Sequence, residues 1–272
     1  MRNAPSIDVI KAFGEEAEPV LLSGGEGFSY KVGNIVLKPV QDVEQASWNA
    51  DVLSSIDEDG FRVLRSIRSM GGEWVYKGWQ AFQYLEGDEK KGNWTEKIAV
   101  SRRFHEKLRG ISKPDFIGKR DIPWERADLA VWSEQPIEFH PAVQHITDSL
   151  SAHIQPIEAK EQLIHGDMTG NILFHPTFPP AIIDFSPYWR SAEYATAIII
   201  VDSIVWEGAP DNLLQEMDNT TENNQLLMRA ALWRMKTSEL FSKSHDQSFV
   251  TEISNYLHFI KMLVQRVEKQ QA

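Results

Sequence analysis

The chain has 272 residues, of which 28 are basic and 39 are acidic, so its formal net charge is −11. Hydrophobic residues make up 42% of the chain, which is enough to build a core and excludes a globally disordered protein. The acidic balance argues against nucleic acid as a partner. The absence of cysteine excludes disulfides, cysteine-bound zinc and thiol nucleophiles, and it fits a cytoplasmic location.

The most apolar run of the chain covers residues 195–206. It is too short to span a bilayer and contains Asp202, so we expect no membrane segment. The run predicts a buried helix or a buried strand within a globular protein.

The N-terminal part of the chain alternates short β-rich runs with polar turns. The dipeptide Gly33-Asn34 separates two such runs and predicts a hairpin. Helices are expected over 7–13 and 43–56 from the spacing of their apolar residues. Strands are expected on both sides of the glycine-rich loop 23–27, and over 61–65 and 80–85.

The polar, glycine-flanked segment 86–92 predicts a hinge or linker. Beyond it, helical patterns predominate: one helix over 95–108, and two amphipathic stretches between 223 and 269 that 243–246 separates. Short β-like runs lie between 161 and 201. This order predicts an α+β fold with a small β-rich N-lobe (1–86) and a larger, mainly helical C-lobe (87–272).

The densest group of polar residues within apolar sequence lies between residues 163 and 174. It contains His165, Asp167 and Asn171, and the apolar run that follows leads to Asp184. Asp and Asn offer hard oxygen ligands that suit Mg²⁺, and a carboxylate can orient a hydroxyl and accept its proton. Each residue alone is better interpreted as a turn or strand cap, but the whole set favours chemistry.

The N-terminal part supplies complementary groups. The loop 23–27 can place backbone N–H groups over a polyphosphate, although such loops are usually only structural. Lys38 lies on a mostly apolar strand, so its charge reaches either water or a cleft. Glu44, early in the next helix, is a possible ion-pair partner for it. His105, on the helix expected over 95–108, is interpreted as a packing or capping residue.

Taken in order, the glycine-rich hairpin, the strand lysine, the helix glutamate, the His-Gly-Asp…Asn motif and the strand-end aspartate resemble the protein-kinase-like fold. The form His165-Gly166-Asp167 resembles the aminoglycoside phosphotransferase and small-molecule kinase branch of that fold. The resemblance extends over residues 21–202 and is most specific over 163–184.

The resemblance implies a nucleotide site in the N-lobe. Lys38 would contact the α- and β-phosphates of ATP and pair with Glu44. The loop glycines would cover the phosphates; these are Gly24, Gly25 and Gly27. The hinge strand would contact adenine, with the amide of Tyr84 or Leu85 as donor; its residues are Gln83, Tyr84 and Leu85.

The resemblance also implies the catalytic groups. Asp167 would be the base that orients the acceptor hydroxyl, and His165 would brace its loop. Asn171 and Asp184 would hold Mg²⁺. The implied reaction moves the γ-phosphoryl of ATP, or of GTP, to a hydroxyl of a small molecule. The acceptor would lie against the C-lobe helices, around 123–132 and after residue 202, and neither its identity nor the oligomeric state is indicated.

One departure from the family pattern keeps a second hypothesis open. Three residues separate Asp167 from Asn171, where the family usually has four. Gly170 can absorb the tighter path because glycine tolerates positive φ. The shortened loop also fits a nucleotide-binding pseudokinase that acts as a regulator or scaffold. A protein that binds no nucleotide is the third interpretation.

Overall fold

The chain folds into two structural units, and two separate segments of the sequence form the first of them. In the computed structural model, which describes residues 4–22 and 28–271, this unit contains Met1–Glu89 and Asn171–Phe185. The second unit contains Lys90–Gly170 and Ser186–Ala272. The predicted lobes, 1–86 and 87–272, differ from these units chiefly in the place of 171–185.

An antiparallel sheet forms the body of the first unit, with strand order β1-β2-β3-β7-β5 and with β6 paired to β7. Gly33 has a φ of 58°, the left-handed conformation that the turn between β2 and β3 needs, and Val32 pairs with Ile35 across it. The strands are β1 (Val20–Leu21), β2 (Tyr30–Val32), β3 (Ile35–Pro39), β5 (Ser66–Ile67), β6 (Val75–Tyr76) and β7 (Trp79–Gln83).

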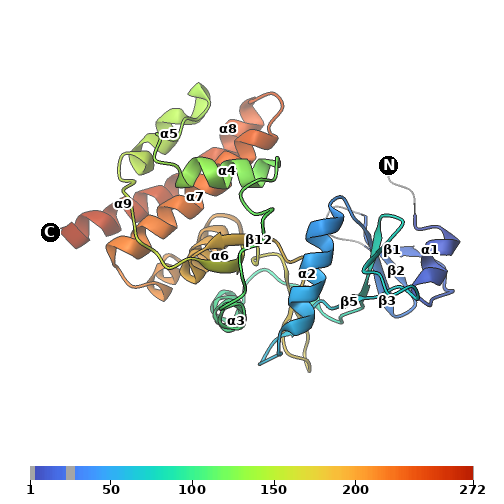
Figure 1. Ribbon diagram of the computed structural model, residues 1–272. Coiled ribbons are helices and arrows are strands. Elements are labelled where there is room, and N and C mark those ends of the chain that lie inside the picture. Colours follow the sequence, from blue (N-terminus) through green and yellow to red (C-terminus); the bar gives the residue numbers. More distant parts are fainter. Residues whose placement is uncertain (1–3, 23–27, 272) are drawn as a thin grey trace. The chain divides into compact units, whose positions relative to one another are not determined.

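Two helices accompany this sheet. Helix α1 (Ile7–Ala12) lies beside strands β1 to β3 (Figure 1). It buries Val9 and Ile10 in one apolar cluster with Leu37 and Ala81. Helix α2 (Val43–Ser55) begins at Asp42, whose carboxylate accepts a hydrogen bond of 3.0 Å from the backbone N–H of the third helical residue. Both helices confirm the predictions over 7–13 and 43–56.

A second, smaller sheet belongs to the same unit. Its order is β4 (Arg62–Val63), β11 (Ala181–Ile182), β10 (Ile172–Phe174) and β8 (Asp88–Glu89). The predicted linker over 86–92 contains the boundary between the units, but its residues 88–89 are strand, because they pair with Leu173 and Phe174. This pairing partner lies far along the chain, so the local polar composition did not indicate it.

The second unit is mainly helical, and α7 packs against α4 and α6 (Figure 1). The apolar run 195–206 belongs to helix α6, which is buried from residue 194 to residue 204, and this settles the choice between helix and strand. The two strands, β9 (Gln162–His165) and β12 (Pro187–Arg190), form an antiparallel ribbon. The helices are α3 (Trp94–Lys107), α4 (Pro123–Trp132), α5 (Pro141–Ser151), α6 (Ala192–Trp206), the 3₁₀ helix η1 (Asp211–Glu216), α7 (Thr221–Phe241), α8 (Gln247–Ser254) and α9 (Leu257–Gln271).

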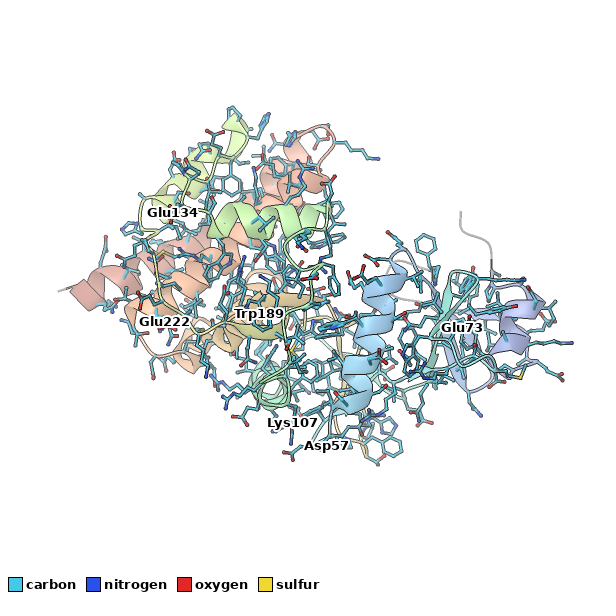
Figure 2. The ribbon with its side chains drawn as sticks, in the orientation of Figure 1. Asp57, Glu73, Lys107, Glu134, Trp189 and Glu222 are labelled. Atoms are coloured by element: carbon cyan, nitrogen blue, oxygen red, sulfur yellow. The ribbon has the colours of Figure 1, made fainter. Side chains whose placement is uncertain are left out.

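Side chains fill the interior of this helical unit. Trp189 of β12 is half-buried, whereas Glu134 and Glu222 are exposed at its surface (Figure 2). The second amphipathic stretch expected before residue 269 is divided into α8 and α9. Across the described ranges, no helix combines the length and the apolar character needed to cross a bilayer.

Candidate functional site

The hairpin of β10 and β11 brings two predicted metal ligands to one end of the small sheet. Ile172 pairs with Ile182, and the backbone N–H of Ile183 donates to the carbonyl of Asn171 at 3.0 Å. Asp184 follows directly, so the 13-residue offset between Asn171 and Asp184 corresponds to a strand, a turn and a strand. The structure thus places both residues at the same end of the hairpin.

Asp184 has a φ of 50°, in the left-handed region that few residues other than glycine adopt. Residues held in such conformations cost free energy and are concentrated at functional sites. The turn of the backbone here ends the strand direction of β11 and leaves the carboxylate 43% exposed. Asp184 is therefore accessible to a ligand.

Lys38 of β3 forms an ion pair with the carboxylate of Asp184, through Nζ and Oδ1. The antiparallel register places Lys38 opposite Gln80 of β7, and its side chain is 23% exposed. The predicted partner, Glu44, lies exposed in the first turn of α2 and forms no ion pair within the described residues. The structure pairs Lys38 with Asp184 and not with Glu44, whose position in the first turn is favourable for any acidic residue.

A cavity of about 150 Å³ in the first unit is lined in part by Asp184, the acidic member of this ion pair. Asn49 of α2 donates from Nδ2 to the carbonyl of Phe185 at 3.2 Å, whereas its buried Oδ1 has no hydrogen-bond partner within the described part of the chain. An orphaned buried acceptor is rare, and it marks a place where a water or ligand donor would be accommodated. The cavity is lined by Asn49, Leu53, Leu64, Ser66, Gln80, Phe82, Asp184 and Phe185.

The predicted hinge has one amide available for a ligand. The backbone N–H of Gln83 donates to Arg65 at 2.9 Å, and that of Tyr84 donates to Asn34 at 3.0 Å. For Leu85, by contrast, the amide has no hydrogen-bond partner among residues 4–22 and 28–271. Of the two amides that the sequence left open as donors to adenine, that of Tyr84 is thus already bonded within the described part of the protein, whereas that of Leu85 is not.

The glycine-rich loop joins β1 and β2. The residues predicted to cover the phosphates, Gly24, Gly25 and Gly27, lie outside the described residues. On either side of the loop the ladder is regular, since Leu21 pairs with Tyr30 and the N–H of Leu22 donates to the carbonyl of Ser29 at 2.8 Å.

In the second unit, His165 ends β9 and is fully buried. Its Nδ1 accepts hydrogen bonds from the backbone N–H of Asp167 at 3.2 Å and of Ser186 at 3.4 Å. The N–H of Gly166 donates to the carbonyl of Ser186 at 2.9 Å. A Cβ on Gly166 would lie 2.4 Å from the ring of Tyr188, so only glycine fits here. These contacts hold the backbone just before Asp167.

His105 of α3 binds the backbone of His165, just before the loop that contains Asp167. Its Nε2 accepts from the backbone N–H of His165 at 2.9 Å, and its Nδ1 lies 2.7 Å from the carbonyl of Ser101. An acceptor Nε2 and a donor Nδ1 require the neutral ring. Burial, together with the neighbouring His165, lowers the pKa of His105 to about 3. The interpretation of His105 as a packing residue is confirmed by its burial.

Asp167 forms an ion pair that the sequence did not indicate. Arg234 of α7 donates from Nη2 to Oδ1 of Asp167 at 2.7 Å, and it also binds Asp202 of α6. Burial lowers the pKa of Arg234, but the charges of Asp202 and Asp167 outweigh burial and raise it above its ordinary value. The available signal was Asp202, a single charge inside an otherwise apolar helical stretch.

The residues at the hairpin end fit a magnesium ion chemically. The carboxylate of Asp184 and the amide oxygen of Asn171 are hard oxygen donors. Mg²⁺ is commonly held by one or two carboxylates together with water and substrate phosphates. Within the described ranges, no group of three or more His, Asp or Glu residues could hold a metal ion.

Comparison by sequence found neither a matching family model nor a matching curated protein. Comparison by structure found aminoglycoside phosphotransferases. A thermostable mutant of APH(4)-Ia, in a ternary complex with AMP-PNP and hygromycin B, is 12% identical with a TM-score of 0.63, over 95% of this chain and 97% of that chain.

Two further solved phosphotransferases have the same fold as this chain. Spectinomycin phosphotransferase APH(9)-Ia, in complex with ADP and spectinomycin, is 16% identical with a TM-score of 0.57, over 96% of this chain and 97% of that one. An aminoglycoside phosphotransferase from Alicyclobacillus acidocaldarius is 14% identical with a TM-score of 0.60, over 98% of each chain. The predicted α+β fold is confirmed, and the chain has the fold of the aminoglycoside phosphotransferases.

Proposed function

We propose that the protein is a phosphotransferase that moves the γ-phosphoryl group of ATP, or of GTP, to a hydroxyl of a small molecule. The observation that carries this proposal is the end of the β10–β11 hairpin. There Asn171 and the strained Asp184 lie together, and Lys38 is bound to Asp184. A cation and two oxygen ligands in this arrangement suit a magnesium-bound polyphosphate.

In the proposed reaction the acceptor hydroxyl oxygen attacks the γ-phosphorus, and the bond from that phosphorus to the β–γ bridging oxygen breaks. The nucleoside diphosphate leaves with that oxygen, and the hydroxyl proton passes to the carboxylate of Asp167. Lys38 would bind the α- and β-phosphates, and the amide of Leu85 would donate to the base. Bound at Asn171 and Asp184, Mg²⁺ would neutralise charge on the phosphates.

The proposal requires that Asp167 and the ligand Asn171 reach one nucleotide. Their separation of four residues limits their Cα atoms to about 14 Å even in a fully extended chain. Covalent connectivity alone therefore keeps the proposed base near the proposed magnesium ligand. The short loop between them is also the feature that favours the pseudokinase alternative.

Two measurements test the proposal. Mg·ATP or Mg·GTP should raise the melting temperature, since a ligand at a hundredfold excess over its Kd stabilises the native state by about 2.7 kcal/mol. Transfer of γ-labelled phosphate should then be measured over a panel of hydroxyl compounds. The panel should include hygromycin B and spectinomycin, which the neighbouring structures contain, together with sugars, amino alcohols and nucleosides.

Asp167→Ala should lower transfer by about 10²–10⁴-fold with nucleotide binding retained, because a general base contributes on that order. Asp115→Ala is the matched control, since Asp115 is an exposed aspartate of the same unit. Binding of Mg·ATP without transfer to any compound or to water would favour the pseudokinase. Absence of stabilisation by either nucleotide would refute both hypotheses.

A further inference from the structure

We infer that Arg234 is a positioning residue for the proposed base, Asp167, and that the buried carboxylate of Asp202 orients Arg234 for this role. The inference rests on the proposed function, because it gives Asp167 the role of base. It concerns residues that come from three separate elements of the second unit: the loop after β9, helix α6 and helix α7.

The guanidinium of Arg234 is oriented by Asp202 first. Nε donates to Oδ1 of Asp202 at 2.9 Å, and Nη2 donates to Oδ2 at 2.5 Å. Two parallel bonds of this kind fix the plane of the guanidinium. The same Nη2 then donates to Oδ1 of Asp167 at 2.7 Å. The direction in which Arg234 reaches Asp167 is therefore set by Asp202.

The shortened loop is attached to the same carboxylate. Thr169 donates from Oγ1 to Oδ2 of Asp202 at 2.9 Å, and Met168 beside it is buried. Thus Asp202 holds the loop directly at Thr169 and indirectly, through Arg234, at Asp167. The shortened loop is thus held at two nearby positions, Asp167 and Thr169.

The exposed fractions of Asp202, Arg234 and Asp167 favour a positioning role for the bond between Arg234 and Asp167 over a purely structural one. The side chains of Asp202 and Arg234 are 10% and 14% exposed, whereas that of Asp167 is 44% exposed. A pair of buried charges already satisfies each other, and a contact to a partly exposed carboxylate adds little to stability. The bond to Asp167 therefore serves mainly to hold that carboxylate in one rotamer, as precise positioning requires.

The test compares kcat and KM for Mg·ATP in a set of variants. The acceptor is the best compound of the panel, or water, with ADP release as the readout. Arg234→Met should lower kcat by about 10–100-fold, part of what a general base contributes, and leave KM for ATP within about twofold. Arg234→Lys should recover part of the loss, since it restores the cation. Arg109→Met, at an exposed arginine, is the control.

A double variant distinguishes an effect of Arg234 that depends on Asp167 from a general loss of structure. If Arg234 acts only through the base, Arg234→Met should cause no further loss in the Asp167→Ala background. Removing Arg234 alone leaves Asp202 buried without its cation, which can prevent folding. The pair Asp202→Asn with Arg234→Met removes both charges, and it should fold and show the same loss of kcat.

Three outcomes would overturn the inference. Wild-type kcat in both Arg234→Met and the neutral pair would exclude a positioning role. An equal fractional loss in the Asp167→Ala background would show that Arg234 acts by another route. If Asp167→Ala itself keeps full kcat, the assignment of the base fails and the inference fails with it. The first two outcomes leave the proposed function intact.

Discussion

His105 gives this fold a defined acid sensitivity. The ring is fully buried beneath the loop that carries Asp167, and its Nε2 accepts the backbone N–H of His165. Protonation would place a hydrogen on Nε2 facing that N–H, so the bond would be lost and a charge would be buried. The protein must therefore unfold locally or globally before His105 can bind a proton.

The size of the stability loss at acid pH follows from the pKa values of His105 in the folded and the unfolded protein. The pKa of His105 is about 3 in the folded protein, against an ordinary value of 6.5. Between these values the unfolded chain binds more protons, so the free energy of unfolding falls as the pH falls. At 1.36 kcal/mol per pH unit, the 1.5 units from 6.5 to 5 remove about 2 kcal/mol.

The assay is urea denaturation at pH 7 and pH 5, followed by tryptophan fluorescence and circular dichroism. His105→Gln places an acceptor oxygen near the position of Nε2 and removes the titrating group. Its loss of stability between the two pH values should be smaller than that of wild type by about 2 kcal/mol. His258→Gln, at an exposed histidine, should behave as wild type. Equal losses in wild type and His105→Gln would refute the reasoning.

Two substitutions test other buried contacts of the second unit. Lys97 is fully buried against Glu207, and Lys97→Met should lower the unfolding free energy by about 3–5 kcal/mol because it leaves a buried carboxylate unpaired. The exposed Lys113→Met is its control in urea denaturation, and equal midpoints would contradict the prediction. Gly166→Ala should destabilise by about 1–3 kcal/mol, since its Cβ would overlap the Tyr188 ring, and Tyr188→Leu in the same chain should restore part of the loss. Wild-type stability of Gly166→Ala alone would show that the ring gives way freely.

The structure also explains which spatial relations could be foreseen. The proximity of Asn171 and Asp184 was predictable because their offset of 13 residues fits one hairpin, and the register of β10 and β11 is local. The strand before Tyr84 was predictable, but the hydrogen bond that occupies the amide of Tyr84 was not. That bond goes to Asn34 and forms only when β3 and β7 are paired.

The ion-pair partners of Lys38 and Asp167 depend on how the helices and strands pack in three dimensions. Glu44 is six residues from Lys38 and was the natural local choice, yet Lys38 pairs with Asp184, 146 residues away in the sequence. The partner of Asp167 is also distant in the sequence, since Arg234 follows it by 67 residues. No sequence spacing encodes such contacts, because they depend on which helices and strands are brought together.

The sequence by itself determined the order of elements, the fold class and the motif that ends at Asp184. Its signals were apolar periodicity, turn residues and motif spacing, all of which act within a few residues of one another. Tertiary structure alone decided that Lys38 pairs with Asp184 and that Asp202 and Arg234 hold Asp167. Long-range electrostatic partners are selected when buried charges must be paired, and that requirement arises only after the helices and strands have packed.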